Sequence, residues 1–427
     1  MPSRGASWLE RWLLLVLVAS AASADPPAPR PLRVGTSGDY APFSIATEQG
    51  FDGFEVAIAR RFAADTGRSL ELVSFRWPEL SHRLVAGDFD LVLSGVTVRP
   101  ERSLLGRFSA PLAESGALVL VRPDADHADP ASLERPGVVL AVNAGGHLER
   151  VARARFPRAR LVAIPDNAAV AAELEAGRVD GVVTDTAEAP VWQARVAGAR
   201  RIGPFTRDRK AAWFRADAEA LAREFDAWLV AREADGTLAE LRARWLGPQA
   251  SPEATAGPLE ALVAAIDERL SLMPAVARAK RTLGAAVRDP AQEERVIAAA
   301  LAAVQDAASR AGVAPPSDAC VRALFDAQML AARRIQERAG EADAPPQAAA
   351  GEAVARPPGP ALSEEIRPAL ARITPRIADA LVALPRATPA RQIREAAGEG
   401  LRDPALDASD RVAIASALVR CAEPVAP

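Results

Sequence analysis

Three short apolar runs near the start of the chain decide the fold of its N-terminal half: LRVG at residues 32–35, LELVS at 70–74 and FDLVL at 89–93. The stretches between them, residues 54–64 and 78–86, have the apolar spacing of amphipathic helices. Strands that alternate with helices typically form βαβ units with parallel strands. We therefore predict an α/β fold around mostly parallel sheets. Further strand-like runs lie at 138–142, 160–163 and 181–183.

Beyond about residue 247 the strand pattern stops. Residues 248–257 are rich in Pro, Gly and Ala, which is typical of a linker. Residues 258–424 are Ala-rich and carry apolar residues at helical spacing, so we predict an all-α domain. A Pro-, Ala- and Gly-rich segment at about 340–360 is predicted to be a mobile connector. The predicted helical stretches are 259–283, 293–311, 320–338 and 362–384.

Residues 1–24 have the features of a secretory signal peptide. Two arginines precede an apolar run from Trp12 to Ala19, and Ala22-Ser23-Ala24 provides a small-residue cleavage site. The run is shorter than the roughly 20 residues of a membrane helix. We expect a periplasmic or secreted chain that begins near Asp25 and has no membrane partner after cleavage. The net charge of −3 also gives no reason to expect a nucleic-acid partner.

Cys320 and Cys421 are the only cysteines, so one intramolecular pairing is available. An oxidising compartment favours a disulfide between them, and two separate thiols are the alternative. The two cysteines and the three histidines, His82, His127 and His147, are not spaced as the ligands of a metal site. We predict neither a metal nor an organic cofactor.

Only two lysines, Lys210 and Lys280, accompany fifty arginines. A lysine is a compact point charge, whereas an arginine presents a wide planar fork. Each lysine is therefore a candidate for a position where the fork would not fit, and coding bias is the alternative.

A series of motifs within residues 31–247 resembles the periplasmic solute-binding proteins that capture polar amino acids. The motifs are GDYAPFS at 38–44, GFEVA at 53–57, WPEL at 77–80, GDFD at 87–90, SGVT at 94–97, ER at 101–102 and FSAP at 108–111. The resemblance implies a ligand cleft between two α/β lobes. One lobe would comprise about 31–116 and 201–247, and the other about 117–200.

Two further stretches, NAGGHLE at 143–149 and TDTAEA at 184–189, are similar to the cyclohexadienyl dehydratases. These enzymes use the same scaffold to convert prephenate or arogenate to phenylpyruvate or phenylalanine. Loss of the ring hydroxyl needs a protonated acid, and the resemblance implies Glu188 in that role. A solvated glutamate at a helix start is the alternative. The implied substrate-binding residues are Tyr40, Trp77, Thr97, Arg102, Gly145, Gly146, His147, Asp185 and Lys210.

Arg269 and Lys280 lie eleven residues apart on one predicted helix. Almost three turns would place both on the same face, about 16 Å apart, and solvated surface charge is the alternative. The wider pattern resembles the secreted gamma-class chorismate mutases, which are all-α. The motifs are DERL at 267–270, AK at 279–280, VRDP at 287–290, FDAQ at 325–328, IQ at 335–336, RPAL at 367–370 and TPR at 374–376.

The mutase resemblance implies a role for each polar residue of the second module. Arg269 and Arg376 would bind the carboxylates of chorismate. Lys280 and Gln336 would donate to its ether oxygen, and Asp289 would accept its hydroxyl or brace neighbouring side chains.

Three positions depart from the family patterns. Leu148 stands where the dehydratases have an amide side chain, and Ala332 stands where a polar residue is usual in the mutases. Gln292 replaces an arginine of the mutases, and Arg295, one turn later, is a candidate replacement.

The two resemblances fit together because the product of the second module is the substrate of the first. We interpret the chain as an exported bifunctional enzyme that converts chorismate through prephenate to phenylpyruvate, with arogenate as a further substrate. The alternative is a binding protein for an amino acid or aromatic acid, fused to a chorismate mutase. A weaker alternative is a scaffold whose two sites have decayed. The sequence leaves the oligomeric state open.

Overall fold

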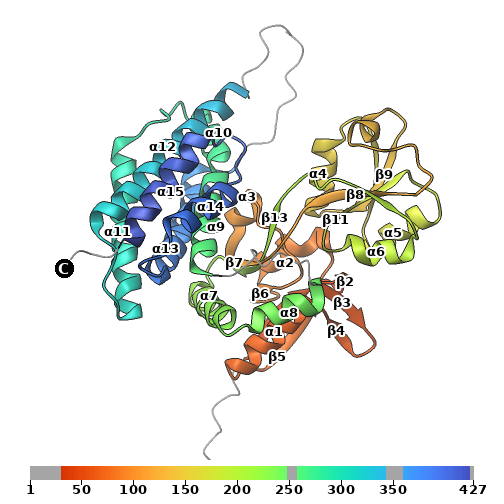
Figure 1. Cartoon of the computed structure of the whole chain (residues 1–427), viewed down its shortest axis with the longest axis horizontal. Helices are drawn as coiled ribbons and strands as arrows, with labels where there is room; N and C mark the ends of the chain where they lie inside the picture. Colours follow the sequence, from red (N-terminus) through yellow and green to blue (C-terminus); the bar gives the residue numbers. More distant parts are fainter. Residues whose placement is uncertain (1–29, 248–256, 343–358, 424–427) are drawn as a thin grey trace, which may run out of the picture.

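The computed structural model describes residues 30–247, 257–342 and 359–423. The predicted signal peptide lies outside these residues, as do most of the predicted linker and connector. Figure 1 shows a helical body beside two α/β lobes, and the labels α3, β7 and α9 lie where the helical body meets the first lobe.

A mixed five-stranded sheet forms the centre of the first lobe, in the order β5-β1-β6-β13-β7. Its strands are β1 (Leu32–Thr36), β5 (Leu70–Ser74), β6 (Leu91–Val92), β7 (Gly106–Ser115) and β13 (Asp208–Arg215). A hairpin sheet adds β2 (Asp39–Tyr40), β3 (Ser44–Thr47) and β4 (Gly50–Asp52). The helices are α1 (Phe54–Asp65), α2 (Leu80–Ala86), α3 (Pro100–Leu105), α7 (Glu219–Ala234) and α8 (Thr237–Leu246). A core of apolar side chains from these elements includes Phe54, Phe89 and Trp213.

The second lobe repeats this arrangement in the order β10-β9-β11-β8-β12. Its strands are β8 (Ala117–Val121), β9 (Val139–Asn143), β10 (Arg160–Ile164), β11 (Gly181–Asp185) and β12 (Arg200–Ile202). Its helices are α4 (His147–Arg155), α5 (Asn167–Glu175) and α6 (Ala189–Arg195).

In each sheet the three predicted strands are parallel, while the other two run antiparallel to their neighbours. The prediction of mostly parallel sheets is therefore only half correct. The antiparallel strands are those that carry the chain between lobes, since β7 leads into β8 and β12 leads back to β13. At the first crossing Gly116 has no room for a side chain, because a Cβ there would lie 2.3 Å from Thr206 O. Strand β12 still pairs with the second sheet at Ile202. The chain therefore returns from the second lobe to the first after that residue.

Seven α-helices make up most of the described helical body. They are α9 (Pro258–Ser271), α10 (Met273–Thr282), α11 (Pro290–Ala311), α12 (Asp318–Ala342), α13 (Arg367–Ala383), α14 (Ala390–Gly400) and α15 (Ala408–Ala422). A short π-helix (Leu362–Ile366) precedes α13. The single helix predicted over 259–283 is interrupted at Leu272. Pro274 explains the interruption, because it lacks an N–H and is best tolerated in the first turn of a helix. Of the described helices, none is long and apolar enough to cross a membrane.

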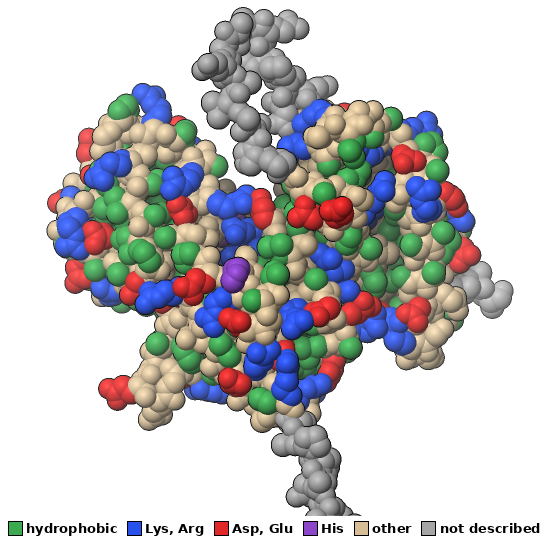
Figure 2. All heavy atoms as spheres, turned by 180° about the vertical axis from the view of Figure 1, so that it is seen from behind, with side chains coloured by type: hydrophobic (Ala, Val, Ile, Leu, Met, Phe, Trp, Pro, Cys, Tyr) green, Lys and Arg blue, Asp and Glu red, His purple; other side chains and the backbone are tan. Residues whose placement is uncertain are grey.

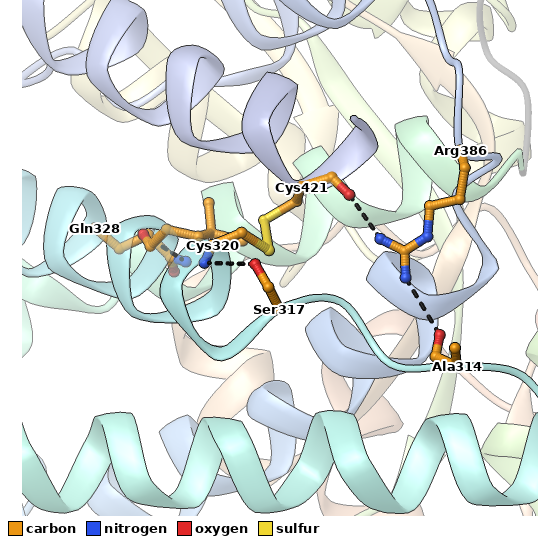
Figure 3. The surroundings of a disulfide bond; sticks show 7 residues. Ala314, Ser317, Cys320, Gln328, Arg386 and Cys421 are labelled. Atoms are coloured by element: carbon orange, nitrogen blue, oxygen red, sulfur yellow. Dashed lines mark hydrogen bonds between the residues drawn. A yellow bond between two sulfur atoms is a disulfide. The ribbon is translucent and has the colours of Figure 1, made fainter. Parts of the chain in front are cut away.

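A disulfide joins Cys320 on α12 to Cys421 on α15 (Figure 3). Arg386 lies beside it and donates to Cys421 O at 2.8 Å and to Ala314 O at 3.3 Å. The bond closes a loop between residues separated by 101 positions, so it fastens the last described helix to the middle of the helical body.

Candidate functional site

A cavity lies between the two α/β lobes, and residues of both lobes line it. The lobes touch across it. The side chain of Asn167 in the second lobe donates to Asp39 O in the first at 3.0 Å, and its backbone N–H donates to the Asp39 carboxylate at 3.1 Å. Seven residues predicted from the sequence line the cavity: Tyr40, Trp77, Thr97, Arg102, Gly146, His147 and Lys210.

Lys210 is at the centre of the polar network in this cleft. It is 2% exposed, and its Nζ donates to Tyr40 Oη at 3.0 Å and to Thr97 Oγ1 at 2.9 Å. It also lies 3.3 Å from Asp185 Oδ2, which accepts a hydrogen bond from the Tyr40 hydroxyl. An ammonium has three N–H donors. Lys210 therefore neutralises Asp185 in this structure and gives two of its three donors to Tyr40 and Thr97.

Arg102 offers the cleft a cation that is not fully paired. It lies on α3, is 2% exposed, and donates from Nη1 to Thr97 O at 3.0 Å, while its buried Nε has no partner among the described residues. Burial, and then repulsion from Arg99, lower the pKa of Arg102 well below its usual value. A buried guanidinium with an unused N–H is a favourable place for an anion. Figure 2 shows basic side chains in the hollow between the second lobe and the rest of the molecule.

Glu188 lies one hydrogen bond behind the cavity wall. It is 1% exposed, its Oε1 accepts from Asn167 Nδ2 at 2.6 Å, and its Oε2 accepts from Thr184 Oγ1 at 2.8 Å. Burial, and then the negative charge of Asp185, raise the pKa of Glu188 well above its usual value. A carboxyl that stays protonated near neutral pH can act as a general acid. Because Asn167 also bonds Asp39 across the cleft, separation of the lobes would release this amide from the first lobe.

The prediction that Gly145 binds substrate is not met in this structure. Gly145 is exposed, does not line the cavity, and gives its N–H to Glu149 Oε2 at 2.7 Å. Its φ is 71°, and a Cβ there would lie 2.9 Å from Pro78 Cα of the other lobe. This glycine therefore permits the lobes to approach each other, and its N–H is not available to a ligand.

His147 and Leu148 both line the cavity. His147 Nε2 lies 3.0 Å from Asp208 Oδ1, and burial lowers the pKa of the histidine. Leu148 is buried, so the family's amide at this position is replaced by an apolar contact.

Three polar side chains of this site were missed by the sequence analysis: Asn143, Thr184 and Asn167. Asn143 ends β9, Thr184 lies on β11 and Asn167 closely follows β10. These strands are parallel, and ligands commonly bind at the carboxyl ends of such strands. These three residues could have been predicted from the sequence, because each is a polar residue at or just after the end of a predicted strand.

A second cavity lies among the helices α9 to α13. Arg269, Lys280, Asp289 and Gln336 line it, as the sequence predicted, although α9 and α10 are separate helices. Gln292 and Ala332 also line it.

Arg269 carries an unpaired charge into this second cavity. It is 5% exposed, and its guanidinium lies 5.8 Å from the centre of the Phe325 ring. In the part of the chain that the structure describes, its Nε and Nη1 have no partner. Burial alone lowers the pKa of Arg269 to about 10. Such a group stays protonated at neutral pH and is stabilised when an anion binds beside it.

Lys280 and Gln336 face the same cavity from α10 and α12. Lys280 Nζ donates to Val287 O at 2.5 Å, and burial lowers the pKa of the lysine. Gln336 Nε2 lies 3.7 Å from Met273 Sδ, and its buried Oε1 has no partner within residues 30–247, 257–342 and 359–423. Asp289 is partly committed to structure, because its Oδ1 accepts from Gln292 N at 3.0 Å and caps α11.

The structure places Arg376 and Arg295 outside this cavity, contrary to the sequence analysis. Arg376 pairs with Glu268 and donates from Nη2 to Ser109 O at 2.9 Å, so it lies against the first lobe. Arg295 is exposed on α11 and donates to Gln292 Oε1 at 2.9 Å. Arg295 lies one turn after Gln292 on α11, and at that position its side chain points to solvent and not into the cavity.

Two other arginines line the second cavity in their place, Arg367 and Arg333. Arg367 precedes Arg376 by nine residues, and nine steps of about 100° place two side chains on opposite faces of a helix. Only one of the two can therefore face the cavity, and the structure selects Arg367. Arg333 enters from α12, and its Nη1 lies 3.3 Å from both carboxylate oxygens of Glu293.

The comparisons with known proteins divide the chain in the same way. Residues 32–248 match the bacterial extracellular solute-binding proteins of family 3, and residues 260–337 match chorismate mutase type II. Within the described residues, no group of three or more His, Cys, Asp or Glu side chains is arranged to hold a metal ion.

Individual relatives of the first half include an enzyme and binding proteins. The chain is 35% identical over 222 residues to the cyclohexadienyl dehydratase of Pseudomonas aeruginosa, covering 50% of this chain and 82% of that protein. It is 26% identical over 219 residues to an L-cystine-binding protein of Escherichia coli, covering 51% and 82%. A solved ancestral amino acid-binding protein, described as a precursor of cyclohexadienyl dehydratase, is 32% identical, with a TM-score of 0.48 and coverage of 50% and 95%. The family match over residues 32–248 and the dehydratase relative confirm the first resemblance, and the chorismate mutase type II match confirms the second.

Proposed function

Because the chain belongs to the bacterial extracellular solute-binding proteins of family 3 and carries a chorismate mutase type II domain after it, we propose a bifunctional exported enzyme. The helical domain would convert chorismate to prephenate. The cleft of the first domain would convert prephenate to phenylpyruvate, and arogenate to phenylalanine. The observation that carries this proposal is a pair of buried, incompletely paired arginines, Arg102 and Arg269, each in its own cavity. Chorismate and prephenate are both dianions.

The dehydration step needs one proton donor and no cofactor. The C–C bond to the ring carboxylate breaks and its electron pair enters the ring, while the C–O bond to the hydroxyl breaks. Glu188 protonates the departing hydroxyl, so carbon dioxide, water and phenylpyruvate leave and the carboxylate recovers its proton from solvent. Arg102 binds a carboxylate that prephenate retains, and the closed lobes exclude water from the cleft.

The mutase step is an isomerisation in which the ether C–O bond breaks as a C–C bond forms. The domain has only to hold the folded dianion and to stabilise negative charge that builds on the ether oxygen. Arg269 and Arg367 bind carboxylates, while Lys280 and Gln336 lie on the adjacent helices as donors to the ether oxygen.

Lys210 argues against the alternative, an amino acid-binding protein fused to a mutase. An amino acid brings its own ammonium, and Asp185 occupies the position that the resemblance assigns to contact with that group. Asp185 is already paired with Lys210 and Tyr40 in this chain. A bound amino acid would have to displace a buried lysine, whereas prephenate has no ammonium to place. Arogenate carries an ammonium, so we expect it to be the poorer of the two substrates.

Arg333 supplies the cation that Gln292 does not. We expect Arg333→Ala to lower kcat/KM for chorismate by roughly 10- to 100-fold, because a charge-assisted hydrogen bond contributes about 1.5–3 kcal/mol. Steady-state mutase kinetics measure this. Gln292→Arg introduced into Arg333→Ala is expected to restore much of the loss, since both residues line the same cavity.

Arg322→Ala is the matched control, because Arg322 also lies on α12 and pairs with α11, through Glu294 at 3.1 Å, but does not line the cavity. Wild-type kinetics in Arg333→Ala, with a loss in Arg295→Ala, would return the role to Arg295.

The proposal as a whole is tested by giving the purified protein chorismate and following chorismate, prephenate and phenylpyruvate together at neutral pH. We expect prephenate to rise and then fall as phenylpyruvate accumulates above the uncatalysed rate. A parallel reaction started from arogenate measures phenylalanine. Prephenate that accumulates without phenylpyruvate would leave the first domain in the binding-protein class.

A further inference from the structure

The short helix α3 carries Arg102 into the cleft between the lobes, and it lies against the helical domain. Helices of so few residues are marginal without support from their surroundings. The last carbonyl groups of a helix have no partner within it, so something outside α3 must satisfy them. The contacts at its end therefore decide how firmly Arg102 is held.

The helical domain provides most of these contacts. Arg372 on α13 donates from Nη2 to Ser103 O at 3.1 Å and to Leu104 O at 2.8 Å. The preceding carbonyl, that of Arg102 itself, accepts from Trp213 Nε1 at 3.2 Å within the first lobe. Basic side chains at the end of a helix both satisfy its carbonyls and oppose its dipole favourably. Arg372 thus caps a helix that belongs to the other domain.

A second contact holds α3 from its side. The Ser103 hydroxyl donates to Glu268 Oε1 at 2.8 Å, and the second oxygen of Glu268 is paired with Arg376. Ser103 is 1% exposed and Glu268 is 4% exposed, so this bridge is buried in the junction. Glu268 is followed in the chain by Arg269, and Ser103 follows Arg102. The two junction residues are therefore the direct neighbours of the two unpaired arginines.

We infer that the helical domain completes the carboxylate site of the cleft, with Arg372 and Glu268 as positioning residues that hold α3 and thereby aim Arg102. Neither residue lines the cleft, so both act through the helix. Arg372 does not line the mutase cavity either, which allows it to be changed without touching that site. The inference rests on the proposed function only in the choice of prephenate as the ligand.

The test is Arg372→Ala in the full chain, assayed with prephenate supplied directly. We expect the KM for prephenate to rise about tenfold or more, the loss typical of a charge-assisted contact, with a smaller change in kcat. The mutase constants should stay at wild-type values. Arg372→Lys should recover most of the loss, because an ammonium can still donate to the carbonyl groups.

Arg223→Ala is the matched control. Arg223 lies in the first domain and pairs with Asp379 of α13 at 3.3 Å, so it crosses the same junction without touching α3. An equal rise of KM in Arg223→Ala would mean that any loosening of the junction has this effect, and would overturn the inference.

Hydrogen exchange of the amides of residues 102–106 provides a readout that does not depend on activity. We expect faster exchange there in Arg372→Ala and wild-type exchange in Arg223→Ala. Unchanged exchange in both variants contradicts the inference even if the protein dehydrates prephenate. Conversely, faster exchange in a protein that never dehydrates prephenate would keep the positioning role and refute the proposed function.

Discussion

Replacement of Glu188 by glutamine is expected to lower the rate of prephenate dehydration by roughly 10³-fold, within the range contributed by a general acid. Glutamine keeps the size of the side chain. Its oxygen can still accept from Asn167 and its NH2 group can donate to Thr184 Oγ1, so the fold should be retained. It cannot give a proton to the departing hydroxyl. Mutase turnover in the other domain should be unchanged. Phenylpyruvate formation from prephenate measures the loss.

The pH dependence follows from the same residue. Only protonated Glu188 can act as the acid, and burial followed by Asp185 raises its pKa well above the usual value. Dehydration should therefore persist at pH values where an ordinary carboxyl, with a pKa of about 4.3, is ionised. The rate should fall as pH rises through the raised pKa. In Glu188→Gln the residual rate should lose this dependence.

The free energy of unfolding should also depend on pH, because the pKa of Glu188 is raised in the folded protein. A carboxyl whose pKa is higher in the folded than in the unfolded state binds more protons when folded. The protein should therefore lose stability as pH rises above the unfolded value of about 4.3. Urea unfolding at several pH values should show a flatter profile for Glu188→Gln.

Glu55→Gln is the control for a second buried glutamate. Glu55 accepts from Gly95 N at 2.7 Å, and burial raises its pKa to about 8. Like Glu188 it lies behind a residue that lines the cavity, but it belongs to the first lobe and has no assigned part in the reaction. We expect this variant to keep most of the dehydratase activity. A loss in Glu55→Gln as large as in Glu188→Gln would show that a buried carboxyl near the cleft matters for reasons other than proton donation. Full activity in Glu188→Gln would remove Glu188 from the reaction.

Replacement of Lys280 by alanine is expected to lower mutase kcat/KM by roughly 10²- to 10³-fold, the typical effect of removing one donor that stabilises transition-state charge. Prephenate dehydration, assayed separately, should be unchanged. Lys280 lines the helical cavity, and its Nζ lies 2.5 Å from Val287 O. Val287 and Asp289 line the same cavity. Disappearance of chorismate measures the effect. A retained mutase rate would move the reaction out of this cavity.

Arg278→Ala is the matched control on the same helix. Arg278 is exposed, lies two residues before Lys280, and does not line the cavity. Its removal also takes away one positive charge, so a general electrostatic effect would appear in both variants. We expect a loss only in Lys280→Ala.

The spacing of apolar residues in the sequence was enough to predict most strands and helices of this protein. The runs at 32–35, 70–74 and 160–163 became strands β1, β5 and β10, and the Ala-rich stretches became helices. Side-chain spacing reports which face of a segment is buried, and that property is local. The two lysines were also informative, because Lys210 and Lys280 line separate cavities.

Tertiary structure decided which side chains meet, because residues on separate elements share a site only through packing. The sequence analysis chose Arg376 as a carboxylate ligand, but the orientation of α13 places Arg367 in the cavity and Arg376 against the first lobe. Asn167 contacts Glu188 because the strand before α5 is parallel to the strand before Glu188, so both side chains lie at the same edge of the sheet. Arg372 contacts the end of α3 from another domain. Local sequence carries no record of such contacts, since they depend on how whole elements are placed.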